Sequence, residues 1–148
     1  MQQTNDDIRF MRLALEEAQL AYEADEVPVG CIVACRGQIV GRGHNLTETL
    51  SDVTAHAEMQ AITAAMQTLG SKYLTDCTLY VTVEPCAMCA GAIGWAQVGR
   101  VVYGAADAKR GYSVFAPKVL HPKCKVQSGL LEEDCAALMT QFFRNKRK

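Results

Sequence analysis

The amino-acid sequence predicts one α/β domain, residues 1–148, in which helices cover both faces of a single sheet to give three layers. Two observations support this fold class. Segments with helical and strand periodicity alternate along the chain, which is typical of layered α/β folds. A length of 148 residues, with 49% hydrophobic and 21% charged residues, suits one globular domain with a substantial core.

Three long segments have apolar residues at every third or fourth position, the spacing of a helix with one buried face. They are 5–24, 55–69 and 130–147. Thr4 or Asn5 can cap the first helix, and Asp52 or Thr54 precede the second as residues of the N-cap type. The last helix ends in basic residues, which suit the negative end of a helix dipole.

Five short runs rich in β-branched or aromatic residues are predicted to be strands. They are 30–34, 38–42, 78–83, 100–105 and 125–127. Arg36-Gly37 is expected to join the first two as a hairpin, and 106–120 is expected to be a loop.

The stretch from Val83 to Cys89 leads from a strand into a short predicted helix over 86–96. Pro85 is expected at the first helical position, where its missing N–H costs nothing. Cys86 and Cys89 then lie on one face of the first turn, where the helix dipole favours thiolates. This helix is apolar on nearly every side, which indicates burial inside one subunit or between two.

Two thiolates need at least one more protein ligand to hold a tetrahedral zinc ion, and His56 is the obvious third. His56 and Glu58 are two residues apart, so they converge only if both side chains reach over the start of a helix. Three protein ligands would leave a fourth position for water beside the Glu58 carboxylate. The sequence therefore predicts a catalytic zinc site.

Two other interpretations remain at this point. Cys86 and Cys89 could form a redox pair. Alternatively, His121 and Cys124 could join them in a closed structural zinc site, which would make the chain a non-catalytic RNA-binding module. The second interpretation leaves Glu58 without a purpose.

Charge is distributed unevenly along the chain, although the net charge is only −1. Residues 1–99 contain 5 Lys/Arg and 12 Asp/Glu, whereas residues 100–148 contain 10 and 4. The basic part indicates either a polyanion-binding surface or a solvated tail.

The sequence also predicts a cytoplasmic protein without a membrane segment. No apolar run approaches the length of about 20 residues that a membrane-spanning helix needs, and the N-terminal residues are polar and acidic. Seven cysteines, an odd number, are expected in a reducing compartment.

The pairing of His56-x-Glu58 with Pro85-Cys86-x-x-Cys89 resembles the signature of zinc-dependent nucleobase deaminases. Nearly the whole chain is similar to the bacterial tRNA adenosine deaminase family. The similar segments are 26–30, 43–45, 54–58, 84–91, 99–111 and 132–144.

The resemblance implies a cytidine-deaminase-like fold around a central five-stranded mixed sheet. It implies a homodimer that converts adenosine to inosine at wobble position 34 in the anticodon loop of tRNA. One Zn²⁺ per subunit would be held by His56, Cys86 and Cys89, and Glu58 would shuttle protons. By the same resemblance, the substrate contacts would be Val29, Asn45, Asp107 and Phe142.

Two features depart from that family pattern. After Gly111 the chain reads Tyr-Ser-Val-Phe-Ala-Pro where small residues are expected, and Trp95 resembles a residue of related guanine deaminases. A deaminase of a free base or nucleoside, guanine or cytidine, is therefore the alternative.

Overall fold

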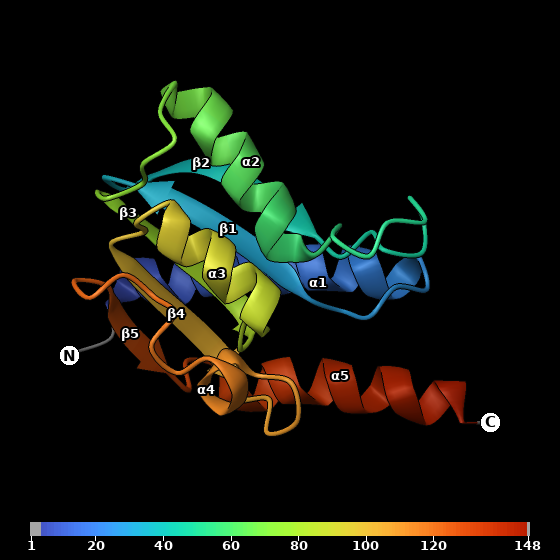
Figure 1. Cartoon of the computed structure of the whole chain (residues 1–148). Helices are drawn as coiled ribbons and strands as arrows, with labels where there is room; N and C mark the ends of the chain where they lie inside the picture. Colours follow the sequence, from blue (N-terminus) through green and yellow to red (C-terminus); the bar gives the residue numbers. More distant parts are fainter. Residues whose placement is uncertain (1–3, 148) are drawn as a thin grey trace.

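The computed structural model describes residues 4–147, which form a five-stranded sheet between two layers of helices (Figure 1). The strands lie in the order β2-β1-β3-β4-β5. Their bounds are β1 Gly30–Cys35, β2 Gln38–His44, β3 Cys77–Val83, β4 Arg100–Ala105 and β5 Lys125–Ser128. β1 pairs antiparallel with β2 and β3, whereas β3, β4 and β5 run parallel. The predicted mixed sheet of five strands is confirmed.

The helices divide between the two faces of the sheet. Their bounds are α1 Asn5–Glu23, α2 Ala57–Leu69, α3 Ala87–Trp95, α4 Tyr112–Phe115 and α5 Glu132–Lys146. One core contains buried residues of α2 and α3, and the other contains buried residues of α1 and α5. Figure 1 shows α2 and α3 in front of the sheet and α1 behind it. The predicted three-layer α/β fold is confirmed.

Each central strand contributes side chains to both cores in alternation. Leu79 and Val81 of β3 belong to the core under α2 and α3, whereas Tyr80 between them belongs to the core under α1 and α5. Successive side chains of a strand point to opposite faces. A strand buried on both faces therefore reads as an unbroken apolar run, as Thr78 to Val83 nearly does.

The predicted hairpin is confirmed at Arg36-Gly37. Both residues have positive φ angles, 52° and 80°, as a two-residue turn of type I′ requires. Gly37 takes this conformation without steric cost because it has no Cβ.

Several predicted boundaries are wrong, and the starts of α2 and α3 matter most. α2 begins at Ala57 with His56 as its N-cap, in place of Asp52 or Thr54. The Asp52 carboxylate instead accepts hydrogen bonds from Thr54 within the preceding loop. α3 begins at Ala87 with Cys86 as its N-cap, so Pro85 precedes the helix and does not occupy its first position.

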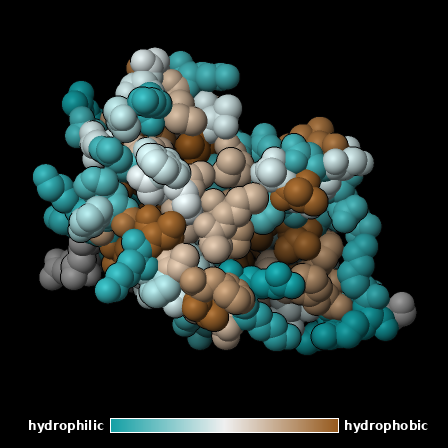
Figure 2. Space-filling model, viewed as in Figure 1, coloured by the Kyte–Doolittle hydropathy of each residue, from teal (hydrophilic) through white to brown (hydrophobic). Residues whose placement is uncertain are grey.

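Two further expectations need correction. The expected loop 106–120 contains the one-turn helix α4, and α5 begins at Glu132 because Leu131 has a φ of 52°. Within the chain, α3 leaves Met88 39% and Trp95 86% exposed, so its complete burial stays a prediction for an interface between two subunits. Figure 2 shows apolar side chains gathered in the centre of this face.

No helix in the described part of the chain is long and apolar enough to cross a membrane.

Candidate metal centre and active site

The topology of the sheet brings the predicted site residues to one end of it. β3 and β4 are parallel, so Cys86 after β3 and Asp107 after β4 leave the sheet at the same end. β1 is antiparallel to β3 and β2 is antiparallel to β1, so Val29 before β1 and Asn45 after β2 lie at this end too. Four segments far apart in sequence therefore surround one pocket.

His56, Cys86 and Cys89 form a compact set of metal donors. Their ligand atoms all lie within 4.8 Å of one another. The Nδ1 atom of His56 is 3.6 Å from the Cys86 Sγ and 3.4 Å from the Cys89 Sγ. A tetrahedral zinc ion with ordinary Zn–N and Zn–S bonds separates such atoms by about 3.6 Å. The donor types and their spacing fit zinc, so the fold brings the three predicted ligands close enough together to bind one zinc ion.

Two of the three ligands occupy N-cap positions. His56 and Cys86 have extended backbone conformations before α2 and α3, and neither side chain makes a capping hydrogen bond. Their side chains are therefore free of the usual capping contact and turn toward each other across the two helix starts. The positive ends of both helix dipoles meet there and favour thiolates.

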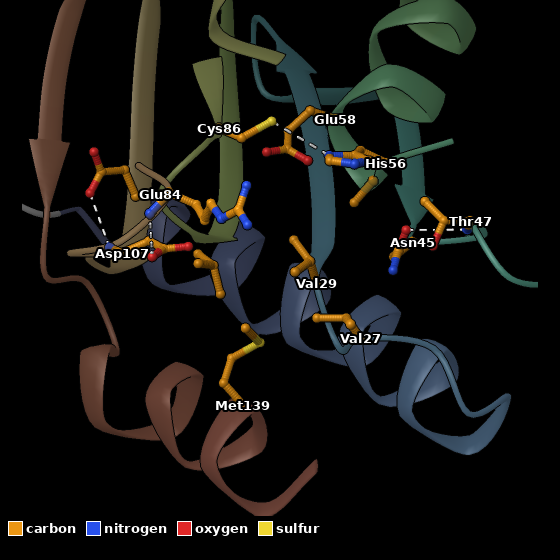
Figure 3. A pocket seen from close by; sticks show the side chains of 13 residues that line it. Val27, Val29, Asn45, Thr47, His56, Glu58, Glu84, Cys86, Asp107 and Met139 are labelled. Carbon is orange, nitrogen blue, oxygen red and sulfur yellow. Dashed lines mark hydrogen bonds between the residues drawn. The ribbon is translucent and has the colours of Figure 1, made fainter. Parts of the chain in front are cut away.

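Glu58 lies in the first turn of α2, beside the ligands, with only 3% of its surface exposed. Burial, only partly offset by the hydrogen bonds that it receives, raises the pKa of Glu58 to about 7. A carboxyl group with a pKa near neutrality can both accept and donate a proton at physiological pH. Figure 3 shows Glu58, His56 and Cys86 gathered on one side of the pocket.

The two cysteine thiols differ in their acidity. The hydrogen bond with Cys89 lowers the pKa of Cys86 to about 4, and His56 contributes in the same direction. That contact, together with burial, raises the pKa of Cys89. One thiolate is thus already favoured by the protein, whereas a bound cation would favour the second.

The pocket next to these ligands has a volume of about 250 Å³. Val29, Asn45 and Asp107, three of the four predicted substrate contacts, line it together with Glu58 (Figure 3). Asn45 is 7% exposed, and its Oδ1 accepts a hydrogen bond from the Thr47 N–H at 3.3 Å. Asp107 Oδ1 accepts hydrogen bonds from the N–H groups of Lys109 and Arg110.

Phe142, the fourth predicted contact, does not line this pocket. It is 6% exposed and packs edge-on against Tyr22 and Phe143. Phe143, its neighbour on α5, is 43% exposed and faces an adjoining groove. Adjacent residues on a helix point in different directions, so only one of the pair can be part of the core.

Several residues that line the pocket were not predicted from the sequence, among them Met139, Arg110 and Glu84. Met139 belongs to the apolar stripe of the last helix and was expected in the core. Arg110 follows Asp107 in a segment without periodicity, and Glu84 belongs to the similar segment 84–91 but was given no role in the pocket. For Glu84 and Arg110 the one available signal was their position shortly after β3 and β4, where site residues of this sheet gather, whereas Met139 lies on α5 and had no such signal.

The closed structural zinc site is not formed. Between residues 4 and 147, the group of His56, Cys86 and Cys89 is the one set of three or more such side chains close enough to bind a metal ion. His121 Nδ1 instead accepts a hydrogen bond from Lys123 N–H, and Cys124 donates to Lys125 O. Glu58 therefore stands beside an open three-ligand site.

Three ligands, a free fourth position and a buried acid define a hydrolytic zinc site on an α/β scaffold. Residues 4–105 match the model of the cytidine and deoxycytidylate deaminase zinc-binding region. The chain belongs to this deaminase family, and zinc is its cofactor.

Relatives within the family resemble this chain over nearly its whole length. A tRNA-specific adenosine deaminase of Agrobacterium fabrum is 46% identical over 143 residues, covering 93% of this chain and 94% of that protein. A solved structure from work on A-to-I editing by tRNA:A34 deaminases is 44% identical with a TM-score of 0.82, covering 88% of this chain and 98% of that one. The guanine deaminase of Bacillus subtilis is 32% identical with a TM-score of 0.66, covering 97% and 95%.

Proposed function

We propose that this protein is a zinc-dependent hydrolase that converts adenosine to inosine at the wobble position, residue 34, of tRNA. The observation that carries the proposal is the buried Glu58 carboxyl beside three metal ligands at the wall of a pocket. The relatives named above as tRNA-specific adenosine deaminases support adenosine in tRNA as the substrate, at 46% identity compared with 32% for the guanine deaminase.

The reaction replaces the amino group on C6 of adenine by oxygen from water and releases ammonia. His56, Cys86 and Cys89 would hold the zinc ion, which supplies the Lewis acidity that activates water at neutral pH. Glu58 takes a proton from the attacking water as the C6–O bond forms and gives a proton to the ring nitrogen N1. Glu58 then takes the remaining proton from the hydroxyl group on C6 and gives it to the departing amine, so that the C6–N bond breaks, ammonia leaves and the C6=O of inosine forms.

The pocket volume of about 250 Å³ is below the range of about 300–1,000 Å³ found for sites of drug-sized ligands. It therefore suits one flipped base, while the rest of the nucleic acid remains outside. Val29, Asn45 and Asp107 are proposed to contact the target nucleoside there. Phe142 stays a predicted RNA contact, and the exposed ring of Phe143 is the better placed of the two for stacking on a base.

A basic groove adjoins the pocket and supports a polyanionic substrate. Its cations are Lys109, Arg110, Lys146 and Arg147, and it shares Asp107, Arg110 and Met139 with the pocket. Phosphate contacts dominate the affinity of proteins for nucleic acids. A free purine base, which has no phosphate, would not need these cations.

The anticodon loop is the proposed binding site on tRNA. Its bases are unpaired, so extruding one of them costs less than opening a base pair. A wide RNA loop can also reach the groove and the pocket together, because the two share one wall.

We further propose a cytoplasmic homodimer. An apolar face formed by α2, α3 and the segment after α2 lies open on the chain, and it is lined by Met59, Ile62, Met66, Tyr73 and Trp95. Trp95 is 86% exposed, and burying such a ring against a second copy would stabilise both chains by the hydrophobic effect. Seven free cysteines suit a reducing compartment.

The test is a substrate comparison with the zinc-loaded protein. An anticodon stem-loop RNA with adenosine at position 34, guanine and cytidine are each incubated with the protein, and inosine, xanthine and uridine are measured by mass spectrometry. We expect inosine from the RNA alone, and none when guanosine replaces the adenosine. Xanthine or uridine alone would overturn the proposal, and no product from any substrate would favour a non-catalytic module.

A further inference from the structure

Glu84 is a buried carboxylate without a place in the chemistry described above. It is 5% exposed and lies between β3 and the metal ligand Cys86. Its side chain points toward the segment after β4 (Figure 3). A buried acid costs free energy unless it is well hydrogen-bonded, so its partners indicate what it does.

Within residues 4–147, the hydrogen-bond donors to its carboxylate all come from one segment, 107–113. The Oε1 atom accepts a hydrogen bond from the Asp107 N–H at 3.1 Å. The Oε2 atom accepts from the Ser113 N–H at 3.1 Å and from the Ser113 hydroxyl at 2.6 Å. Hydrogen bonds to a charged acceptor are stronger than those between neutral groups. One carboxylate therefore holds both ends of this segment through hydrogen bonds.

Backbone contacts complete the attachment. The Tyr112 N–H donates to the carbonyl of Pro85 at 2.8 Å, and Gly111 pairs with Cys86 in an isolated β-bridge. A Cβ at Gly111 would come within 2.4 Å of the Glu84 carboxylate. Only glycine leaves the space that this carboxylate occupies. The segment and the metal-binding turn thus form one unit.

The residues held between the two attachment points are those that face the pocket. Asp107 and Arg110 both line it, and the Asp107 carboxylate accepts the N–H groups of Lys109 and Arg110. Releasing the ends of the segment would release these two side chains. The segment that carries them is attached to the metal-binding turn by the Glu84 carboxylate as well as by the backbone contacts.

We propose that Glu84 is a positioning residue: its carboxylate fixes the segment 107–113 against the metal-binding turn and so sets where Asp107 and Arg110 meet the substrate. The inference rests on the proposed function for the nature of that substrate. It does not assign Glu84 any proton transfer or metal contact.

The test uses the zinc-loaded protein with Glu84→Gln and Ser113→Ala. The first variant keeps the side-chain shape but places an N–H₂ group against N–H donors, whereas Ser113→Ala removes one hydrogen bond at an exposed residue and leaves folding intact. Hydrogen exchange of the segment 106–115 is compared with that of β3, and zinc content is measured. For Glu84→Gln we expect the Asp107 and Ser113 amides to exchange about tenfold faster or more, with β3 unchanged and one zinc per chain retained.

Kinetics with the stem-loop RNA separate positioning from a merely structural contribution. We expect Glu84→Gln to raise KM about tenfold and to change kcat less than about threefold, because looser substrate contacts weaken binding throughout the reaction. Ser113→Ala should raise KM by a smaller factor. Asp7→Asn, which removes a buried acid far from the pocket, is the stability control and should leave KM unchanged.

Unchanged exchange of the segment, or an unchanged KM with only a lower melting temperature, would overturn the inference. The exchange measurement needs no substrate. If the wild-type protein deaminates no RNA, the proposed function is wrong. The exchange rates of the Asp107 and Ser113 amides would still test the positioning role of Glu84.

Discussion

The four residues at the centre of the site lie at the starts of two helices, and their positions there separate the three metal donors from the one acid. His56 and Cys86 occupy N-cap positions and Cys89 lies one turn into α3, so three donors converge. Glu58 lies in the first turn of α2 and is buried. Because its oxygens are not needed for the three-donor set, this carboxyl is available for protons.

We expect Glu58→Gln to retain one zinc per chain and to lower kcat by about 10²–10⁴-fold, the usual contribution of a positioned general acid–base. Zinc is measured by atomic absorption and inosine formation by mass spectrometry. His56→Ala is the matched variant, since it removes a ligand from the same helix start and should lose zinc as well as activity. Appreciable activity in Glu58→Gln would refute the assignment of proton transfer to this residue.

At the scale of elements, helix α1 is tied to the sheet by a second buried acid. Asp7 accepts hydrogen bonds from both Arg100 Nη atoms of β4 at 2.8 Å and from the Tyr80 hydroxyl of β3 at 2.6 Å. Its carboxylate also completes a capping box with Thr4. These contacts, with Arg100 foremost, lower the pKa of Asp7 from 3.8 to about 2.

The lowered pKa means that the ionised Asp7 stabilises the folded state by about 2 kcal/mol. This contribution is complete above the unfolded pKa of 3.8 and is lost as the pH falls toward about 2. We expect Asp7→Asn to lower the free energy of unfolding by about 2 kcal/mol at pH 7, with a smaller difference from wild type at about pH 2.5. Urea denaturation at both pH values measures this.

Asp6→Asn is the control for that comparison. Asp6 also lies in the first turn of α1, but its side chain is 67% exposed and its ion pair with Arg9 is 3.7 Å long. Exposed ion pairs contribute little to stability. Equal losses of unfolding free energy in the two variants would show that the helix dipole, and not the contacts of Asp7 with Arg100 and Tyr80, accounts for the stabilisation.

At the scale of the whole molecule, the fold collects charge and apolar surface in different places. Cations of the loop after β4 and of α5 meet in the basic groove beside the pocket. The apolar face is formed by α2, α3 and Tyr73, and it shares no lining residue with the basic groove. A nucleic acid and a second subunit could therefore bind without competing for one surface.

We expect the wild-type protein to sediment as a dimer at micromolar concentration and Trp95→Glu to sediment as a monomer, because a charge would have to be buried at the interface. Leu20→Glu is the matched control, since Leu20 is 48% exposed on α1, across the sheet. A monomeric wild type, or a dimer that tolerates Trp95→Glu, would contradict the proposed homodimer. Equilibrium sedimentation distinguishes these outcomes.

Features set by neighbours in sequence were predictable, and features set by distant contacts were not. The hairpin at Arg36-Gly37 and the strands were predicted because turn chemistry and period-2 patterns are local. The starts of α2 and α3 were misplaced because propensity favoured Asp52, Thr54 and Pro85. The structure instead places His56 and Cys86 at the helix starts, where their side chains serve the metal site.

The sequence by itself determined the three-layer fold and predicted His56, Cys86 and Cys89 as metal donors beside Glu58, since two short motifs with fixed spacing suffice to predict an open metal site. Only the tertiary structure decided which residues surround that site. The Glu84 carboxylate accepts hydrogen bonds from a segment more than twenty residues away. This contact depends on how strands that are distant in sequence align at one end of the sheet, and no local pattern contains that information. The burial of Phe142, in contrast, agrees with the apolar stripe of the last helix.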